Sequence, residues 1–189
     1  ETPFYAESGG QVGDTGVIQT DSCTIQVLDT TKNASGVYTH KAVVKEGFVR
    51  AGDTAHAAVD AERRFAIMRN HTAAHLLQAA LRTVLGDHVE QAGQLVNEQA
   101  VRFDFTHFSA LTDDELLAVE KLVNEKILEN IPVECREMPI EEAKKLGAMA
   151  LFGEKYGDVV RVVSAGDFSK ELCGGTHMDA TAKLGLFKI

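Results

Sequence analysis

Apolar and polar residues follow two different patterns along the chain, and the change lies near Asp60. In the first part, runs with alternating or β-branched side chains, such as residues 24–28 and 37–44, are separated by glycines at intervals of about ten residues. This arrangement is typical of short strands joined by turns. It predicts a β-rich, barrel-like module over residues 1–60.

A helical pattern begins directly after this module. From residue 61 to residue 85 the chain contains no Gly or Pro, and apolar residues recur at helical spacing. Gly86 follows as a stop signal. Thr112 and Glu115 form a capping-box sequence, which predicts a second helix over residues 113–130.

Further apolar runs indicate strands. We expect strands over residues 95–105, 133–138 and 159–163, and a short helix over residues 139–145. Helices that cover one antiparallel sheet would bury the apolar faces of both. The predicted fold class is therefore α+β, in which the barrel-like module at 1–60 precedes a helix-on-antiparallel-sheet core at 61–189.

The composition is that of an ordinary folded protein. Apolar residues make up 44% and charged residues 25% of the 189 residues, close to the averages for globular domains. No apolar run approaches the ~18–20 residues that cross a bilayer, so we expect no membrane partner. Three scattered cysteines are too few for a disulfide framework, which favours the cytoplasm. Because the chain starts without Met and stops in an apolar segment, we expect a piece of a longer protein.

The net charge argues against strong nonspecific binding of nucleic acids. The chain has 28 acidic residues and 19 Lys and Arg, and the resulting charge of −9 repels phosphate at long range. Contact with a nucleic acid therefore has to be local or to depend on a tethered module. Arg63, Arg64 and Arg69 on the predicted first helix are candidates for meeting phosphates, and a solvated helix face is an equal alternative.

Two short motifs carry candidate metal ligands. His71 and His75 are four residues apart on the predicted helix, so both imidazoles lie on one face. The glutamate of the metalloprotease motif is absent, which excludes that mechanism. Cys173 and His177 flank a Gly-Gly-Thr turn that suits the binding of one ion. Three imidazoles and a thiolate together favour zinc over Mg²⁺ or Ca²⁺, although either pair alone is more often structural.

These motifs resemble those of the editing domain of alanyl-tRNA synthetases. Related motifs occur in the free-standing AlaX proteins and in the editing domain of threonyl-tRNA synthetases. The resemblance rests on residues 70–75 and 173–177, and it extends over residues 2–14, 85–91 and 101–105, which also match. It therefore covers nearly the whole chain.

The resemblance implies an activity and a ligand set. The activity is hydrolysis of the ester in tRNA(Ala) whose acceptor end carries Ser or Gly, in concert with the remaining domains of a full-length synthetase. The implied Zn²⁺ ligands are His71, His75, Cys173 and His177. Gln91 matches a glutamine of the family's editing pocket, where it would position substrate or water because an amide is too weak a base.

Several further residues are substrate-binding candidates. Thr72 and Thr176 lie beside the ligands and could contact the serine hydroxyl, although local capping or packing is the commoner role. Gln11 and Asp14 could contact the terminal adenosine, which only the family context suggests. Two alternatives stay open, namely a zinc-stabilised RNA-binding module without catalysis and a free-standing AlaX-type deacylase.

Overall fold

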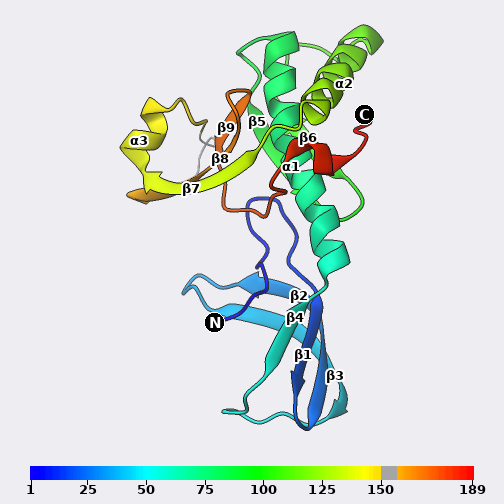
Figure 1. The fold of residues 1–189 in the computed structure, drawn as a ribbon, viewed down its shortest axis with the longest axis vertical. Coiled ribbons are helices and arrows are strands. Elements are labelled where there is room, and N and C mark those ends of the chain that lie inside the picture. The colour runs from blue at the N-terminus through cyan, green and yellow to red at the C-terminus, as the bar shows by residue number, and fades with distance from the viewer. Residues whose placement is uncertain (150–156) are drawn as a thin grey trace.

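The computed structural model describes residues 1–149 and 157–189. It confirms the α+β class, since helices and antiparallel sheets occur together. A four-stranded sheet lies at one end of the molecule (Figure 1), and the long first helix leads from it into a second group of helices and strands. No helix of the described residues is long and apolar enough to cross a membrane.

The N-terminal sheet is open. Its strands pair antiparallel in the order β3-β2-β1-β4, and no ladder in the described residues joins the edge strands β3 and β4. The expected barrel therefore does not close, and the module is a sheet with two edges. The strands are β1 (Gly16–Thr20), β2 (Cys23–Lys32), β3 (Tyr38–Gly47) and β4 (His56–Val59).

Helix α1 (Ala61–Leu85) has the bounds that the sequence predicts. The side chain of Asp60 accepts a hydrogen bond from the Arg63 amide at the start of the helix. At the other end Gly86 has a φ of 114°, which ends the helix. Most residues of its second half are buried, so α1 is the central element of the core.

The region after α1 is a hairpin and not one strand. Strand β5 (Gln91–Val96) turns back into β6 (Val101–Phe105), so the single strand expected over residues 95–105 is wrong. Asn97 makes the turn, because its side-chain oxygen accepts hydrogen bonds from the amides of Gln99 and Ala100.

The second helix packs against the first. Helix α2 (Asp113–Leu128) begins at the predicted capping box, in which Thr112 and Glu115 bond to each other's backbone. It ends before residue 130, where Asn130 adopts a φ of 51°. The core between α1, α2 and the last sheet contains, among others, Leu76, Leu77, Leu81, Val119, Val123 and Val163.

The last sheet has the order β7-β8-β9. For two of its strands and the short helix between them, the predicted ends agree with the observed ends to within two residues. Strand β9 and the final 3-10 helix were not predicted. These elements are β7 (Val133–Pro139), α3 (Ile140–Lys145), β8 (Val159–Ala165), β9 (Ser169–Leu172) and η1 (Thr181–Leu184).

The segment before β1 leaves the N-terminal sheet and lies against the core. Its residues Gly10 and Val12 exchange backbone hydrogen bonds with Val96 of β5. In Figure 1 this blue segment rises from the sheet toward α1. The division at residue 60 stays a prediction, and residues 8–12 contact the second part.

Candidate metal centre and its pocket

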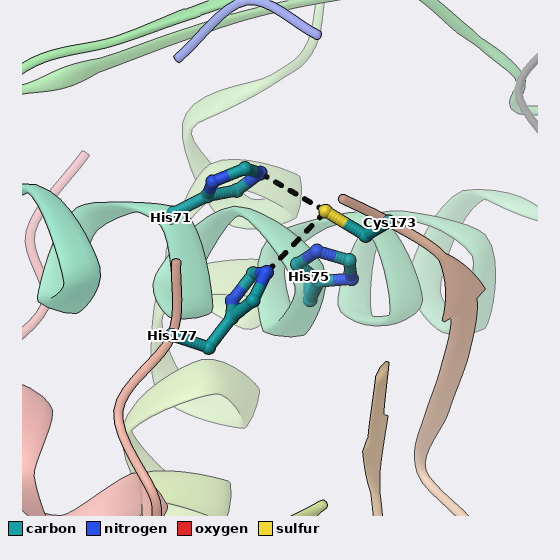
Figure 2. A group of neighbouring side chains, drawn as sticks. All are labelled: His71, His75, Cys173 and His177. Atoms are coloured by element: carbon teal, nitrogen blue, oxygen red, sulfur yellow. Dashed lines mark hydrogen bonds between the residues drawn. The ribbon is translucent and has the colours of Figure 1, made fainter. Parts of the chain in front are cut away.

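Four side chains converge beside α1. Their nitrogen and sulfur donor atoms all lie within 4.8 Å of one another. Figure 2 shows His71 and His75 on neighbouring turns of α1, with Cys173 and His177 approaching from the chain after β9. The Cys173 Sγ is 3.5 Å from His71 Nε2 and 3.3 Å from His177 Nε2. The structure thus brings together the four residues that the two motifs predict as ligands.

The Gly-Gly turn allows this approach. A Cβ atom on Gly175 would lie 2.1 Å from the Cε1 atom of His71, whereas one on Gly174 would meet nothing within 4 Å. Arg161 of β8 holds the same turn, because its Nη1 donates hydrogen bonds of 2.9 and 2.7 Å to the carbonyls of Cys173 and Gly175.

Each histidine has an outer partner on its second ring nitrogen. The Nδ1 atoms of the three rings lie beside an amide, a carboxylate and a hydroxyl, each from another segment of the chain. The pairs are His71 with Gln11 Oε1 at 2.7 Å, His75 with Glu171 Oε2 at 3.0 Å and His177 with Thr72 Oγ1 at 3.3 Å. Such partners are typical of metal-binding histidines, because they orient the ring and set its tautomer.

The His75–Glu171 pair is an ion-pair contact. The separation is short, yet His75 Nδ1 makes no hydrogen bond within the described residues, so the contact is electrostatic. Burial, the largest single effect, lowers the pKa of His75, and the contributions of Glu171 and Cys173 together outweigh burial and raise the pKa to about 10. Binding of a metal therefore requires His75 to release a proton.

The thiol of Cys173 favours its metal-binding form. Burial alone would raise its pKa, but the neighbouring imidazoles of His177, His71 and His75 hold the pKa far below the ordinary value. Burial lowers the pKa of His177, which keeps that ring neutral. A thiolate and neutral imidazoles are the donors that zinc prefers, so the residues fit this ion.

A cavity of about 310 Å³ opens beside the cluster. His71 and Cys173 belong to its wall, and so do Tyr5, Arg161 and Gln94. Burial raises the pKa of Tyr5 to about 12, so its phenol stays protonated.

Gln91 lines a second, much smaller cavity. Its other walls include His75, Cys173 and Glu171, and its volume is about 10 Å³. That is room for about one water molecule. The structure thus places Gln91 beside the cluster, and its role there stays a prediction.

Other predicted site residues are buried and make contacts within the chain. Asp14 is 1% exposed, pairs with Arg64 and accepts a hydrogen bond from the Tyr5 amide, and Gln11 is 0% exposed. Both side chains are buried in contacts within the chain, and the adenosine contacts expected of them stay a prediction. Arg64 is likewise engaged by Asp14 instead of a phosphate.

The remaining candidates lie outside the described lining of the larger cavity. Thr72 is buried, and its hydroxyl contacts His177 and accepts from the Met178 amide. Thr176 is half-buried and bonds to Gln11. Arg69 is half-buried on α1. Thr72 and Thr176 thus make local contacts, and their contact with the serine hydroxyl stays a prediction.

Sequence reasoning missed Glu171 and Arg161. One signal for Glu171 was available, because it lies two residues before Cys173 at the end of a strand, and alternate residues share a face. No spacing points to Arg161, whose contacts with the turn depend on the pairing of β8 with β9.

Known proteins resemble the chain over its whole length. The family described as "tRNA synthetases class II (A)" matches residues 1–63, and "Threonyl and Alanyl tRNA synthetase second additional domain" matches residues 160–189. The alanine–tRNA ligase of Acetivibrio thermocellus is 59% identical over 188 residues, 100% of this chain and 21% of the relative. That of Bacillus subtilis is 53% identical over 189 residues, 100% of this chain and 22% of the relative. The chain spans about a fifth of the length of these relatives, so it is similar to one region of alanine–tRNA ligases.

Proposed function

We propose that the chain edits mischarged tRNA, by hydrolysing the ester of tRNA(Ala) that carries Ser or Gly. One observation carries the proposal: His71 and Cys173 belong both to the four-donor cluster and to the wall of the 310 Å³ cavity. Groups that could hold a metal therefore face a space that could hold the end of a substrate. The shared domain of threonyl and alanyl enzymes supports the assignment.

Editing compensates for the limited ability of a binding site to select between similar amino acids. A site shaped for alanine cannot exclude the smaller glycine, and it discriminates weakly against the one added hydroxyl of serine. A second, hydrolytic site supplies the missing selectivity. In this proposal the 310 Å³ cavity receives the aminoacyl end of the tRNA.

Zn²⁺ is the proposed cofactor, held by His71, His75, Cys173 and His177. When bound, it would polarise the ester carbonyl or lower the pKa of a water molecule. The chain's own contribution is to orient the three imidazoles through their outer partners.

Gln91 is the proposed residue that positions water or substrate. It lines the small cavity beside His75 and Cys173, which has room for about one water molecule. An amide orients a water through hydrogen bonds and does not accept its proton, so Gln91 is not a general base.

The proposed partners are tRNA(Ala) and the remaining domains of a full-length synthetase. Because the charge of the chain is −9, attraction of the phosphate backbone has to come from elsewhere. Tethering to other tRNA-binding domains would raise the local concentration of the acceptor end. The synthetase family implies a cytoplasmic location.

A second candidate is a structural metal site in an RNA-binding module without catalysis. The observation in its favour is the number of donors, because four protein ligands are typical of closed structural zinc sites. This candidate predicts that loss of the metal unfolds the chain and that Gln91 is replaceable.

Deacylation assays separate the two candidates. The chain is incubated with Ser-tRNA(Ala), Gly-tRNA(Ala) or Ala-tRNA(Ala), and the same assays are run with Cys173→Ala. The exposed Cys135 provides a matched control, Cys135→Ala, that removes a thiol remote from the cluster. We expect selective hydrolysis of the seryl and glycyl esters that Cys173→Ala abolishes and Cys135→Ala retains. A folded, zinc-loaded chain that spares all three esters would contradict editing by this chain.

A further inference from the structure

Gln11 connects the N-terminal segment to the candidate metal centre. Its side chain is 0% exposed and lies between His71 on α1 and the turn after Cys173. The Oε1 atom is 2.7 Å from His71 Nδ1 and 2.9 Å from the amide nitrogen of Thr176. The Nε2 atom donates a hydrogen bond of 2.9 Å to Thr176 Oγ1. All polar atoms of this buried amide are therefore engaged.

These contacts determine the proton position on His71. A backbone amide can only donate, so the Gln11 atom that faces the Thr176 amide is the acceptor oxygen. His71 Nδ1 faces the same oxygen and therefore carries a hydrogen. In a neutral imidazole the other nitrogen then has the free lone pair. That nitrogen, Nε2, is the atom that points into the cluster, 3.5 Å from the Cys173 sulfur.

We propose that Gln11 is a positioning residue that holds His71 in the metal-binding tautomer and orientation. The metal centre would then depend on the N-terminal segment as well as on the two ligand motifs. The inference rests on the metal site of the proposed function and does not depend on the hydrolysis. It gives Gln11 a role different from the adenosine contact expected from the sequence.

The packing around Gln11 leaves the ring few alternatives. A Cβ atom on Gly175 would lie 2.4 Å from His71 Nδ1 and 2.9 Å from Gln11 Oε1, so the turn closes over this contact. If the oxygen were lost, the Nδ1 hydrogen would be buried without an acceptor, which destabilises that tautomer. Removing an outer partner of a metal ligand typically weakens metal binding by about 10–100-fold.

The test compares three variants of the chain by zinc affinity and by the absorption spectrum of the Co²⁺ form. Gln11→Met keeps the size of the side chain and removes the acceptor. Gln11→Glu keeps an acceptor oxygen. Arg63→Met is the matched control, because the Arg63 Nη1 donates a 2.8 Å hydrogen bond from α1 to Gly13 of the same segment without touching His71.

We expect Gln11→Met to raise the zinc dissociation constant by about 10–100-fold and to change the Co²⁺ spectrum. Gln11→Glu and Arg63→Met should stay within about tenfold of the unaltered chain, with its Co²⁺ spectrum. Unchanged affinity in a folded Gln11→Met chain would overturn the inference, and so would an equal loss in Arg63→Met. If Gln11→Met does not fold, Gln11→Glu decides: retained zinc binding supports the inference, and lost binding rejects it. If the unaltered chain binds no zinc, the proposed metal site itself fails.

Discussion

Gly175 offers the sharpest test of the cluster's geometry. It lies between Cys173 and His177, and neither it nor Gly174 has a left-handed backbone, so an alanine at either position adds only a methyl group. At Gly175 this methyl group would lie 2.1 Å from the His71 ring, and at Gly174 it would lie in open space. The two neighbouring substitutions therefore differ in whether the added methyl group meets the His71–Gln11 pair.

The size of the effect follows from the required movement. To reach the 3.4 Å of an ordinary contact, the imidazole of His71 or the turn has to shift by about 1.3 Å. Metal–ligand distances vary by only about 0.2 Å, so the shift removes one ligand from the set. It also breaks the 2.7 Å contact between His71 and Gln11. We expect Gly175→Ala to weaken zinc binding by on the order of 100-fold or more, and to lower the free energy of unfolding by about 1–3 kcal/mol.

The assay is competition between the chain and a chromophoric chelator for zinc. Gly174→Ala serves as the control and should bind zinc as the unaltered chain does. Circular dichroism on the same samples shows whether each variant is folded. Equal zinc affinity of the two alanine variants would refute the proposed packing of His71 against the turn.

Three further predictions concern the outer partner of His75, the core and a helix cap. Glu171→Gln should raise the zinc dissociation constant by about tenfold in the same competition, because the carboxylate beside His75 Nδ1 is replaced by a neutral amide. Leu81→Ala should lower the free energy of unfolding in urea by about 2–5 kcal/mol, since Leu81 is buried between α1 and α2; a much smaller loss would place it outside the core. Hydrogen bonds from Thr112 lower the pKa of Glu115, so the ionised carboxylate of Glu115 stabilises the folded chain. This stabilisation is complete above the ordinary pKa of 4.5 and is lost as the pH falls through the lowered pKa. The difference in Tm between the unaltered chain and Glu115→Gln should therefore be present at pH 7 and shrink below pH 4.5, and a difference independent of pH would contradict this.

Local signals predicted the elements whose ends are set by neighbouring residues. Helix α1 has a capping aspartate before it, a glycine after it and no interruption between, so its bounds follow from the sequence. The hairpin of β5 and β6 was missed, because its turn depends on the Asn97 side chain within an otherwise strand-like run. Sheet closure in the N-terminal module was also mispredicted, since strand spacing does not distinguish a barrel from an open sheet.

The candidate site likewise has a part that local spacing predicts and a part that it does not. The two ligand pairs could be predicted because each lies within five consecutive residues, at a spacing that puts both donors on one side. The outer partners could not be predicted in this way, since Gln11 and Glu171 meet His71 and His75 across long stretches of chain. Gln11 in its glycine-rich loop suggested a substrate contact, and only the structure shows that its side chain is buried against His71.

The most direct test of the central claim is the rate of Ser-tRNA(Ala) hydrolysis as a function of zinc content. The chain is stripped of metal with a chelator, checked for folding, and reloaded in steps with zinc before each assay. The proposal predicts a folded metal-free chain without activity and a rate that rises in proportion to bound zinc, up to one ion per cluster. A metal-free, folded chain that hydrolyses the seryl ester as fast as the loaded one would contradict it.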